Sequence, residues 1–146
     1  MPPVELAPGF FVSPQIAPAD VAAAKARGVT LIVNNRPEGE EPGQPKGADI
    51  AEAASRAGLA YVAIPVGPAG VSEAHLDALD EALKANQGAV LAFCKSGTRS
   101  TIVRAFAQAR AGRSPRQLIE EAAAAGFNIT GAASKLETLA KAPRNQ

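Results

Sequence analysis

The sequence predicts an α/β domain built on a central, mostly parallel sheet. Short apolar runs recur along the chain, segments with helical periodicity separate them, and glycines follow most of these helical segments. The 146 residues are about the length of one ordinary domain, and 47% of them are hydrophobic, which is typical of a globular protein. Because glycine and proline are spread along the chain without forming a linker, we expect a single domain over residues 1–146, with its core at about 10–141.

Local patterns predict the elements of the first half. Pro18 is typical of the first turn of a helix, and Gly28 is typical of a helix end. The β-branched run at 29–33 indicates a strand buried on both faces, and the polar loop at 34–47 is long enough to indicate a functional role. The predicted elements are a strand at 10–12, a helix at 18–27, a strand at 29–33, a helix at about 48–57 and a strand at 60–64.

The second half repeats the alternation of strands and helices. Ser72 is a suitable N-cap for a helix whose buried stripe contains Leu76, Leu79 and Leu83. Ser114 is the N-cap of a later helix that has proline at its first position. The predicted elements are a loop at 65–71, a helix at 73–85, a strand at 89–93, a helical pattern after residue 100, a helix at 115–125 and a last helix at about 131–141.

Composition excludes several classes of function. With 15 basic and 14 acidic residues the net charge is +1, so no overall field attracts nucleic acid or an anionic membrane. One cysteine and one histidine exclude a disulfide framework and a metal site rich in either residue. The N-terminal residues lack the features of a secretory signal, and no apolar run is long enough to span a bilayer. We therefore expect a cytoplasmic protein that needs no metal or cofactor and binds neither nucleic acid nor membrane.

The segment from 94 to 100 carries the chemistry. It follows the apolar run at 89–93 and precedes a helix, and successive backbone N–H groups in such a turn converge on an anion that the helix dipole also favours. This placement favours the ionised form of the Cys94 sulfur, and Arg99 adds a planar pair of donors. The predicted catalytic residues are Cys94 and Arg99, and the predicted anion- or substrate-binding residues are Lys95, Ser96, Gly97, Thr98 and Ser100, the last as a donor to the sulfur.

Four motifs resemble those of one protein family. They are Asn-Asn-Arg-Pro at 34–37, Gly-Gln-Pro at 43–45, Ile-Pro-Val at 64–66 and Cys-Lys-Ser-Gly-Thr-Arg-Ser at 94–100. Over roughly residues 10–125 the chain resembles the bacterial beta-lactamase-hydrolase-like protein family, whose domain is related to dual-specificity protein tyrosine phosphatases. The resemblance implies the three-layer fold of those phosphatases, with a mostly parallel sheet between helices and a Cys–Arg loop between the last parallel strand and the next helix.

The sequence departs from the phosphatase pattern in two ways. Tyrosine phosphatases have five residues between the cysteine and the arginine, whereas four separate Cys94 from Arg99. Phosphatases also carry an acidic residue upstream that protonates the leaving group, but the segment at 65–71 contains no carboxylate. Asp77 and Asp80 follow soon after, inside a predicted helix, where we expect them on the solvated face. The shorter loop resembles that of rhodanese-type sulfurtransferases, whose reaction needs no general acid.

Three functional hypotheses follow from these observations. The leading hypothesis is a sulfurtransferase in which Cys94 takes sulfane sulfur from a small anionic or persulfide substrate and passes it to a thiol acceptor. The alternative is a phosphatase that hydrolyses a phosphomonoester through a phosphocysteine. The third is a non-catalytic module that binds anions or senses redox state. The structural alternative for Cys94 is a small buried apolar residue at a strand end.

Two further residues, Arg36 and His75, have weaker signals. Arg36 lies on the long loop after a parallel strand, at the sheet edge where ligands bind in α/β proteins. It is therefore a possible pocket residue, and the alternative is a surface ion pair with Glu40 or Glu41. His75 lies in the first turn of a predicted helix, where we expect it to be exposed and without a catalytic role.

Overall fold

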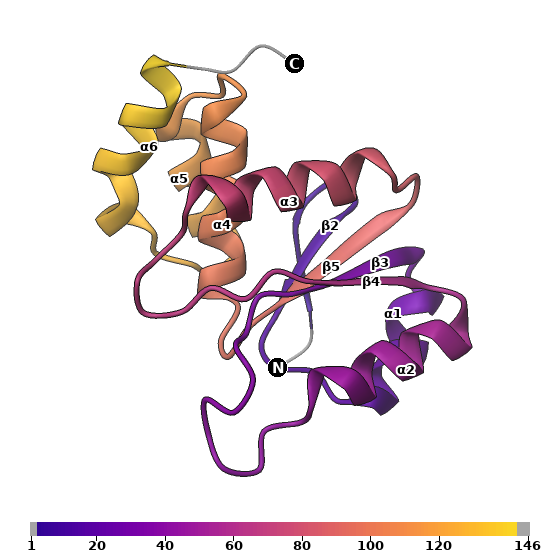
Figure 1. The fold of residues 1–146 in the computed structure, drawn as a ribbon. Helices are drawn as coiled ribbons and strands as arrows, with labels where there is room; N and C mark the ends of the chain where they lie inside the picture. Colours follow the sequence, from indigo (N-terminus) through magenta and orange to yellow (C-terminus); the bar gives the residue numbers. More distant parts are fainter. Residues whose placement is uncertain (1–2, 143–146) are drawn as a thin grey trace.

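Over residues 3–142, which the computed structural model describes, five strands form one sheet in the order β1-β2-β5-β3-β4. Neighbouring strands from β2 to β4 pair in parallel, and β1 pairs antiparallel with β2 at one edge (Figure 1). The strand bounds are Val4–Ala7 for β1, Phe10–Ser13 for β2, Val29–Asn34 for β3, Ala60–Ala63 for β4 and Ala89–Phe93 for β5. The last parallel strand in the sequence, β5, is therefore the central strand of the sheet.

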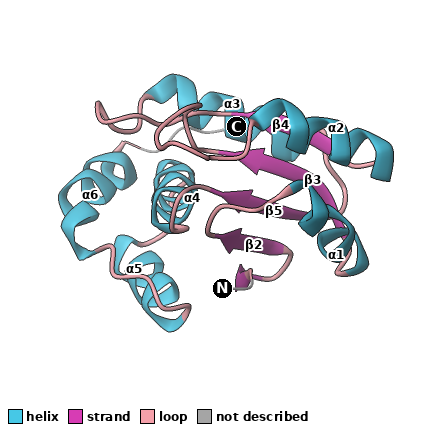
Figure 2. Ribbon diagram, turned by 90° about the horizontal axis from the view of Figure 1, so that it is seen from below, coloured by secondary structure: helices cyan, strands magenta, loops and turns pink. Residues whose placement is uncertain are grey.

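Helices cover both faces of the sheet. The helix bounds are Val21–Ala26 for α1, Gly47–Ala57 for α2, Glu73–Lys84 for α3, Thr98–Arg110 for α4, Pro115–Ala124 for α5 and Ala133–Lys141 for α6. Short 3₁₀ turns precede α1 and α6. One face packs against α1 and α2, and the other packs against α3 to α6, with α4 in the middle (Figures 1 and 2). Buried residues occur all around α4, as in a helix at the centre of a core.

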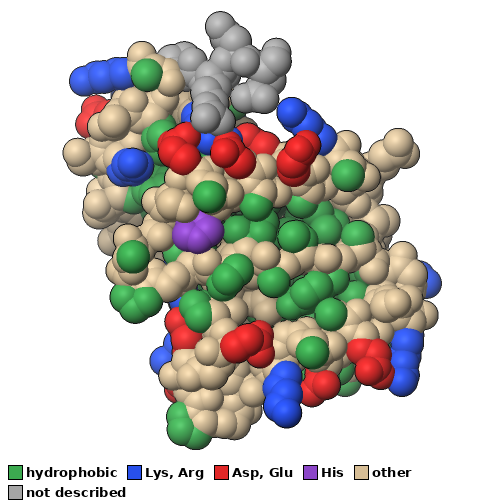
Figure 3. Space-filling model, in the orientation of Figure 1, with side chains coloured by type: hydrophobic (Ala, Val, Ile, Leu, Met, Phe, Trp, Pro, Cys, Tyr) green, Lys and Arg blue, Asp and Glu red, His purple; other side chains and the backbone are tan. Residues whose placement is uncertain are grey.

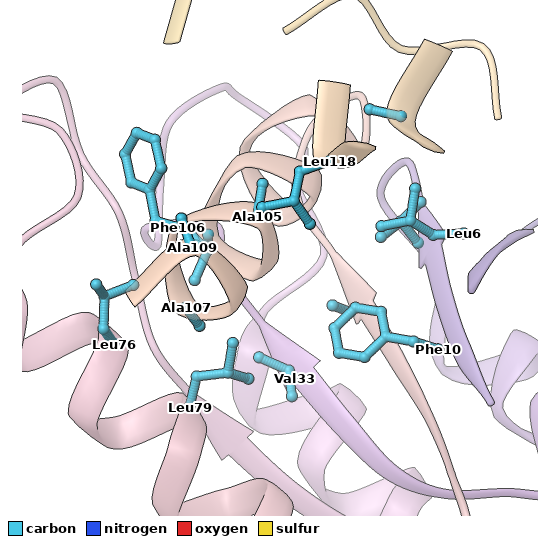
Figure 4. Close-up of a cluster of buried hydrophobic side chains, with 14 of the residues drawn as sticks. Leu6, Phe10, Val33, Leu76, Leu79, Ala105, Phe106, Ala107, Ala109 and Leu118 are labelled. Atoms are coloured by element: carbon cyan, nitrogen blue, oxygen red, sulfur yellow. The ribbon is translucent and has the colours of Figure 1, made fainter. Parts of the chain in front are cut away.

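Alternation along the strands assigns side chains to the two cores. Phe10 and Val33 lie in the core beneath α3, α4 and α5, where they approach α4 (Figure 4). Phe11, Ile32 and Phe93 lie on the opposite face of the sheet, in the core that α1 and α2 close. Because β3 and β5 are buried on both faces, their side chains are almost continuously apolar, as expected for central parallel strands.

The predicted α/β architecture with a mostly parallel sheet is confirmed, and most predicted elements are observed with ends that differ by at most three residues. The sequence prediction missed β1, because this strand has only four residues and is flanked by prolines at both ends. The helix after the Cys94 turn begins at Thr98, so Arg99 and Ser100 belong to its first turn rather than to the loop. Leu83 is only half-buried, because it lies close to the end of α3.

The two edge strands, β1 and β4, lie away from the centre of the sheet, and β4 is partly exposed. Hydrophobic side chains gather on the surface over β4, between α2 and α3 (Figure 3). By contrast, β3 and β5 are neighbours near the middle of the sheet and point in the same direction, so their carboxyl ends lie together. Among the described residues, no helix has the length and apolar character needed to cross a membrane.

Candidate active site

Cys94 follows β5 directly and is 1% exposed. Its backbone N–H donates to the carbonyl oxygen of Ser13 at 3.3 Å, which extends the pairing of β2 with β5 into the turn. Its Sγ accepts a hydrogen bond from the backbone N–H of Gly97 at 3.1 Å. The turn therefore curls around the sulfur, with the Gly97 amide directed at that atom.

Gly97 is required by the shape of this turn. It is the N-cap of α4 and has φ of +96°, which residues with a side chain rarely adopt. A Cβ at this position would also lie 3.1 Å from ring atoms of Phe127, which closes the far side of the turn. Both constraints explain why a glycine separates the cysteine from the helix.

Arg99 is held by two groups from other loops. Its Nη1 donates to Oε2 of Glu40 at 2.8 Å and to the carbonyl oxygen of Val66 at 2.8 Å, and its Nη2 donates to Oε1 of Glu40 at 2.9 Å. The hydrogen bonds to Glu40 are the main cause that raises the pKa of Arg99, and the nearby Cys94 sulfur raises this pKa further. The guanidinium thus lies beside the sulfur in a defined orientation.

Five side chains form a chain of alternating charges beside the turn, which we call the charge ladder: Arg99, Glu40, Arg36, Glu41 and Lys95. Arg36 is its buried member, at 5% exposed. It donates to Glu40 at 2.8 Å, to Glu41 at 2.6 Å and to Oε1 of Gln15 at 3.1 Å. Lys95 lies at the exposed end, 3.2 Å from Glu41. The ladder connects the 34–47 loop to both ends of the Cys94 turn.

Both carboxylates of the ladder are ionised at neutral pH. The hydrogen bonds from Arg99 are the largest cause that lowers the pKa of Glu40, from an ordinary value of 4.5 to about 2, and Arg36 adds to this effect. The hydrogen bond from Lys95, followed by that from Arg36, lowers the pKa of Glu41. A carboxyl group that stays ionised in this way cannot supply a proton near neutral pH, so neither residue is a general acid in the free protein.

Glu40→Gln is expected to destabilise the protein by about 1 kcal/mol near neutral pH, because it removes one charge of a partly exposed ion pair. The folded-state pKa of Glu40 lies below its ordinary value of 4.5, so its contribution is present above pH 4.5 and is lost as the pH falls toward 2. Urea unfolding of wild type and variant should therefore give free energies of unfolding that converge over this range.

Glu52→Gln is a matched control, because Glu52 forms an exposed ion pair with Arg56 on α2, away from the ladder. It should change the free energy of unfolding little at any pH. A gap between wild type and Glu40→Gln that stayed constant down to pH 2 would show that the side-chain charge contributes nothing.

Asn35 and Ser100 form a buried polar pair behind the turn. Ser100 Oγ donates to Oδ1 of Asn35 at 2.8 Å, and Nδ2 of Asn35 donates to the carbonyl oxygen of Ile64 at 3.0 Å. Both side chains are 1% exposed. The expectation that Ser100 donates to the cysteine sulfur is therefore wrong in this structure, because its hydroxyl donates instead to Asn35, directly after β3. Ser100 instead fixes the first turn of α4 against β3.

The structure places the remaining loop residues at the mouth of the turn. Ser96 Oγ and Thr98 Oγ1 lie 3.2 Å apart, and the exposed Lys95 side chain pairs with Glu41. Arg36 forms the ion pairs with Glu40 and Glu41 that the sequence offered as its alternative, although its own side chain is buried rather than on the surface. It is absent from the described residues that line the groove beside Arg99, so it is not a pocket residue there. It acts on the site through Glu40.

The acidic residues of α3 lie away from the Cys94 turn. Asp77 and Asp80 pair with the buried Arg110 at 2.9 and 2.7 Å, and Glu73 joins them at 3.0 Å. Arg110 is the last residue of α4, and 12 residues of helix put it about 18 Å from the turn. The prediction of a simple solvated face is therefore incomplete, because these carboxylates neutralise a buried guanidinium.

His75 lies in the first turn of α3, where it completes the capping box with the N-cap Ser72, and it is not part of the site. Its ring Nδ1 accepts a hydrogen bond from the backbone N–H of Ser72 at 2.9 Å, and Ser72 Oγ accepts from the backbone N–H of His75. The side chain is half-buried rather than exposed, because this reciprocal contact holds it against the helix end. Among the described residues, no group of three histidine, cysteine or carboxylate side chains could hold a metal ion.

Sequence reasoning missed the partners of Arg99. Glu40 was considered only as a partner of Arg36, and the Val66 carbonyl was not considered at all. The usable signal was topological, since loops that follow adjacent parallel strands meet at one edge of the sheet. Applied to the loops after β3, β4 and β5 together, this rule places the 34–47 loop, the 65–71 loop and the Cys94 turn side by side.

Known structures show which class of protein has this arrangement. A candidate phosphatase of Neisseria meningitidis z2491 aligns with a TM-score of 0.83 and 28% identity over 93% of this chain and 96% of that chain. Human DUSP28 aligns with a TM-score of 0.68 and 27% identity over 97% of this chain and 95% of that chain. The fold is thus that of the tyrosine-phosphatase-like class, as the motif resemblance implied.

Within this class, the chain belongs to the family described as beta-lactamase hydrolase-like protein, phosphatase-like domain, whose model matches residues 4–111. Two beta-lactamase hydrolase-like proteins are similar to it. One, from Xylella fastidiosa (strain 9a5c), is 41% identical over 112 residues, and the other, from Agrobacterium fabrum (strain C58 / ATCC 33970), is 38% identical over 120 residues. These matches cover 76% and 82% of this chain but only 26% and 28% of the relatives, so the chain spans about a quarter of their length.

Proposed function

We propose that this protein is a cysteine-dependent phosphatase that hydrolyses a phosphomonoester. The observation that carries the proposal is the environment of the Cys94 sulfur. The Gly97 N–H points at this atom, and the oriented guanidinium of Arg99 lies beside it. Similarity to the Neisseria candidate phosphatase and to DUSP28 supports this reaction over sulfur transfer, the leading hypothesis from the sequence. The family matched by residues 4–111 supports the same preference.

The orientation of Arg99 fits an oxyanion receptor. A guanidinium has five N–H donors, and three of those of Arg99 bond to the oxygens of Glu40 and Val66. The other two, on Nε and Nη2, share one edge of the planar group and can hold two oxygens of a phosphoryl group. Glu40 therefore fixes the end of the guanidinium and leaves this edge for a substrate. We assign Glu40 a positioning role.

The reaction proceeds in two displacements. The Cys94 thiolate attacks phosphorus, the S–P bond forms, and the ester P–O bond breaks with its electron pair going to the leaving oxygen. Arg99, the turn amides and the positive end of α4 hold the non-bridging oxygens as their charge changes. Water then attacks phosphorus, the S–P bond breaks, and inorganic phosphate leaves with the thiolate restored.

Sulfur transfer is the second candidate, and two features of the sequence favour it. Cys94 and Arg99 are separated by four residues, and no carboxylate occurs in the 65–71 segment. Both features fit a reaction whose leaving groups, thiols or sulfite, need no protonation near neutral pH. In that reaction the thiolate attacks a sulfane sulfur, the S–S bond of the donor breaks as a thiolate or sulfite leaves, and a persulfide forms on Cys94. An acceptor thiolate then attacks the outer sulfur, which yields the acceptor persulfide and restores the Cys94 thiolate.

Parallel assays of the reduced protein distinguish the two candidates. One assay measures phosphate release from an aryl phosphate, and the other measures intact mass after incubation with thiosulfate or glutathione persulfide. We expect phosphate release that Cys94→Ser abolishes, and no stable one-sulfur adduct. Phosphate release at the Cys94→Ser background level together with an adduct on Cys94 would overturn the proposal in favour of sulfur transfer. If neither phosphate nor a sulfur adduct formed, the proposal would also fail, in favour of a module that binds anions without turnover.

A further inference from the structure

A cavity with a volume of about 380 Å³ lies on the face of the sheet that α1 and α2 cover. This volume is within the range of sites that bind small molecules. The apolar residues that line it are Phe11, Ile16, Ala24, Val29 and Leu91. Cys94 and Arg99 are not among the described residues that line it, so a molecule in this cavity would occupy a site separate from the Cys94 turn.

One side of α1 forms a wall of the cavity and carries a charge at each end. The residues of this wall are Asp20, Ala23, Ala24 and Arg27. Because they are spaced by three, four and seven residues, they lie on one face of the helix and its two flanking positions. Seven residues of helix put Asp20 and Arg27 about 10 Å apart along the axis. An elongated occupant therefore meets a cation at one end and an anion at the other.

Arg27 can act as an anion receptor at its end of the cavity. Its guanidinium carbon lies 4.3 Å from the centroid of the Phe11 ring, and its Nη1 donates to the carbonyl oxygen of Pro3 at 3.3 Å. These two contacts orient the guanidinium. No carboxylate of residues 3–142 pairs with it. Of its five N–H groups, only one has a partner in the described part of the chain, so a carboxylate can take two others side by side.

The remaining polar side chains of the cavity disfavour further charge on the occupant. The exposed carboxylate of Asp20 repels a second anionic group. Ser13 Oγ and Gln15 Nε2 each donate to the carbonyl oxygen of the residue that follows, and Gln15 Oε1 accepts from Arg36. Because these groups already have partners, they offer little to a polar occupant. The body of the occupant is therefore apolar, and its single anionic group lies at Arg27.

We propose that this cavity binds a small hydrophobic monocarboxylate, with its carboxylate on Arg27 and its apolar body over Phe11 and Leu91. Burial of the body against the sheet releases water from the apolar lining and stabilises the complex. The contacts of Arg27 with Phe11 and Pro3 orient the guanidinium in advance, so less side-chain entropy is lost on binding. The site is separate from the proposed phosphatase reaction and does not depend on it.

Calorimetry with phenylbutyrate and phenylbutyramide tests the proposal, because the two molecules have the same shape and differ in charge. The titrations are made in excess inorganic phosphate, which occupies any oxyanion site at the Cys94 turn. We expect phenylbutyrate to bind about tenfold more tightly than the amide, as a charge-assisted pair with Arg27 predicts. Equal binding of the two, or no binding of phenylbutyrate, would overturn the proposal. Tighter binding of phenylbutylamine than of phenylbutyrate would also overturn it, because Asp20 would then select the ligand.

Three substitutions in α1 and at its end locate the site. Arg27→Gln should lower the affinity for phenylbutyrate to that for the amide and leave amide binding unchanged. Ala23→Leu places a larger side chain in the cavity from an exposed helix position and should weaken binding of both molecules by about tenfold. Ala26→Leu is the matched control, because Ala26 is an exposed residue of α1 outside the cavity, and it should bind both as the wild type does. If Ala23→Leu also bound both like the wild type, or if Arg27→Gln kept the preference for the carboxylate, the ligand would lie elsewhere and the proposal would be wrong.

Discussion

Arg99→Lys is expected to lower the rate of phosphate release from an aryl phosphate by about 10²–10³, the usual cost of losing one oriented oxyanion donor. Lysine keeps the positive charge near Cys94, but its ammonium is a compact point charge without the planar fork of donors of a guanidinium. It cannot hold the Glu40 carboxylate end-on and present a second, parallel pair of N–H groups to a phosphoryl group. The loss would therefore report geometry, since the charge is unchanged.

Steady-state kinetics and competitive inhibition by inorganic phosphate measure this effect. Arg56→Lys is the control, because Arg56 is an exposed arginine of α2 whose partner is Glu52. That substitution should leave kcat and the inhibition constant unchanged. If Arg99→Lys retained activity within about threefold of wild type, Arg99 would only neutralise charge. The turn amides would then be the whole receptor.

The sequence was sufficient to predict the part of the site that is local. An apolar run, a cysteine, a glycine-containing turn and a helical pattern follow one another within residues 89–110, and no distant contact is needed to predict them. The structure has the same order, with β5, the turn and α4 contiguous along the chain. The helix begins only slightly earlier than expected, at Thr98, because Gly97 with its positive φ acts as the N-cap.

The partners of the site could not be read in the same way, because they depend on the order of strands in the sheet. Glu40 is 59 residues from Arg99 in the sequence, and Asn35 is 65 residues from Ser100. Both contacts exist because β3 lies next to β5, although β4 separates them along the chain. Local periodicity predicts that strands exist but carries no information on which ones are neighbours.

This arrangement explains how an exposed loop becomes part of a defined site. Arg36 is buried and holds Glu40, and Glu40 in turn holds Arg99. The guanidinium is thereby oriented before a substrate arrives, so less side-chain entropy is lost when an oxyanion binds. The carboxylate also keeps the free site from accumulating an excess of positive charge.

Asn35→Ala is expected to lower the free energy of unfolding by about 2–4 kcal/mol. The amide of Asn35 accepts from the Ser100 hydroxyl and donates to the Ile64 carbonyl in a region closed to water. Removing the amide leaves a buried donor and a buried acceptor without partners, and each such group costs about 1–3 kcal/mol. Urea unfolding followed by circular dichroism gives the value directly.

A double-mutant cycle separates the hydrogen bond from the rest of the effect. Ser100→Ala removes only the hydroxyl and should cost about 1–2 kcal/mol, because one acceptor of Asn35 is left unpaired. In the double variant the Ser100 hydroxyl is absent, so Asn35→Ala no longer leaves a buried hydroxyl without an acceptor. The double variant should therefore lose about 1 kcal/mol less free energy of unfolding than the sum of the losses in the two single variants. Strict additivity would show that Asn35 acts through the Ile64 carbonyl and the β3 end alone, and that Ser100 does not anchor the first turn of α4.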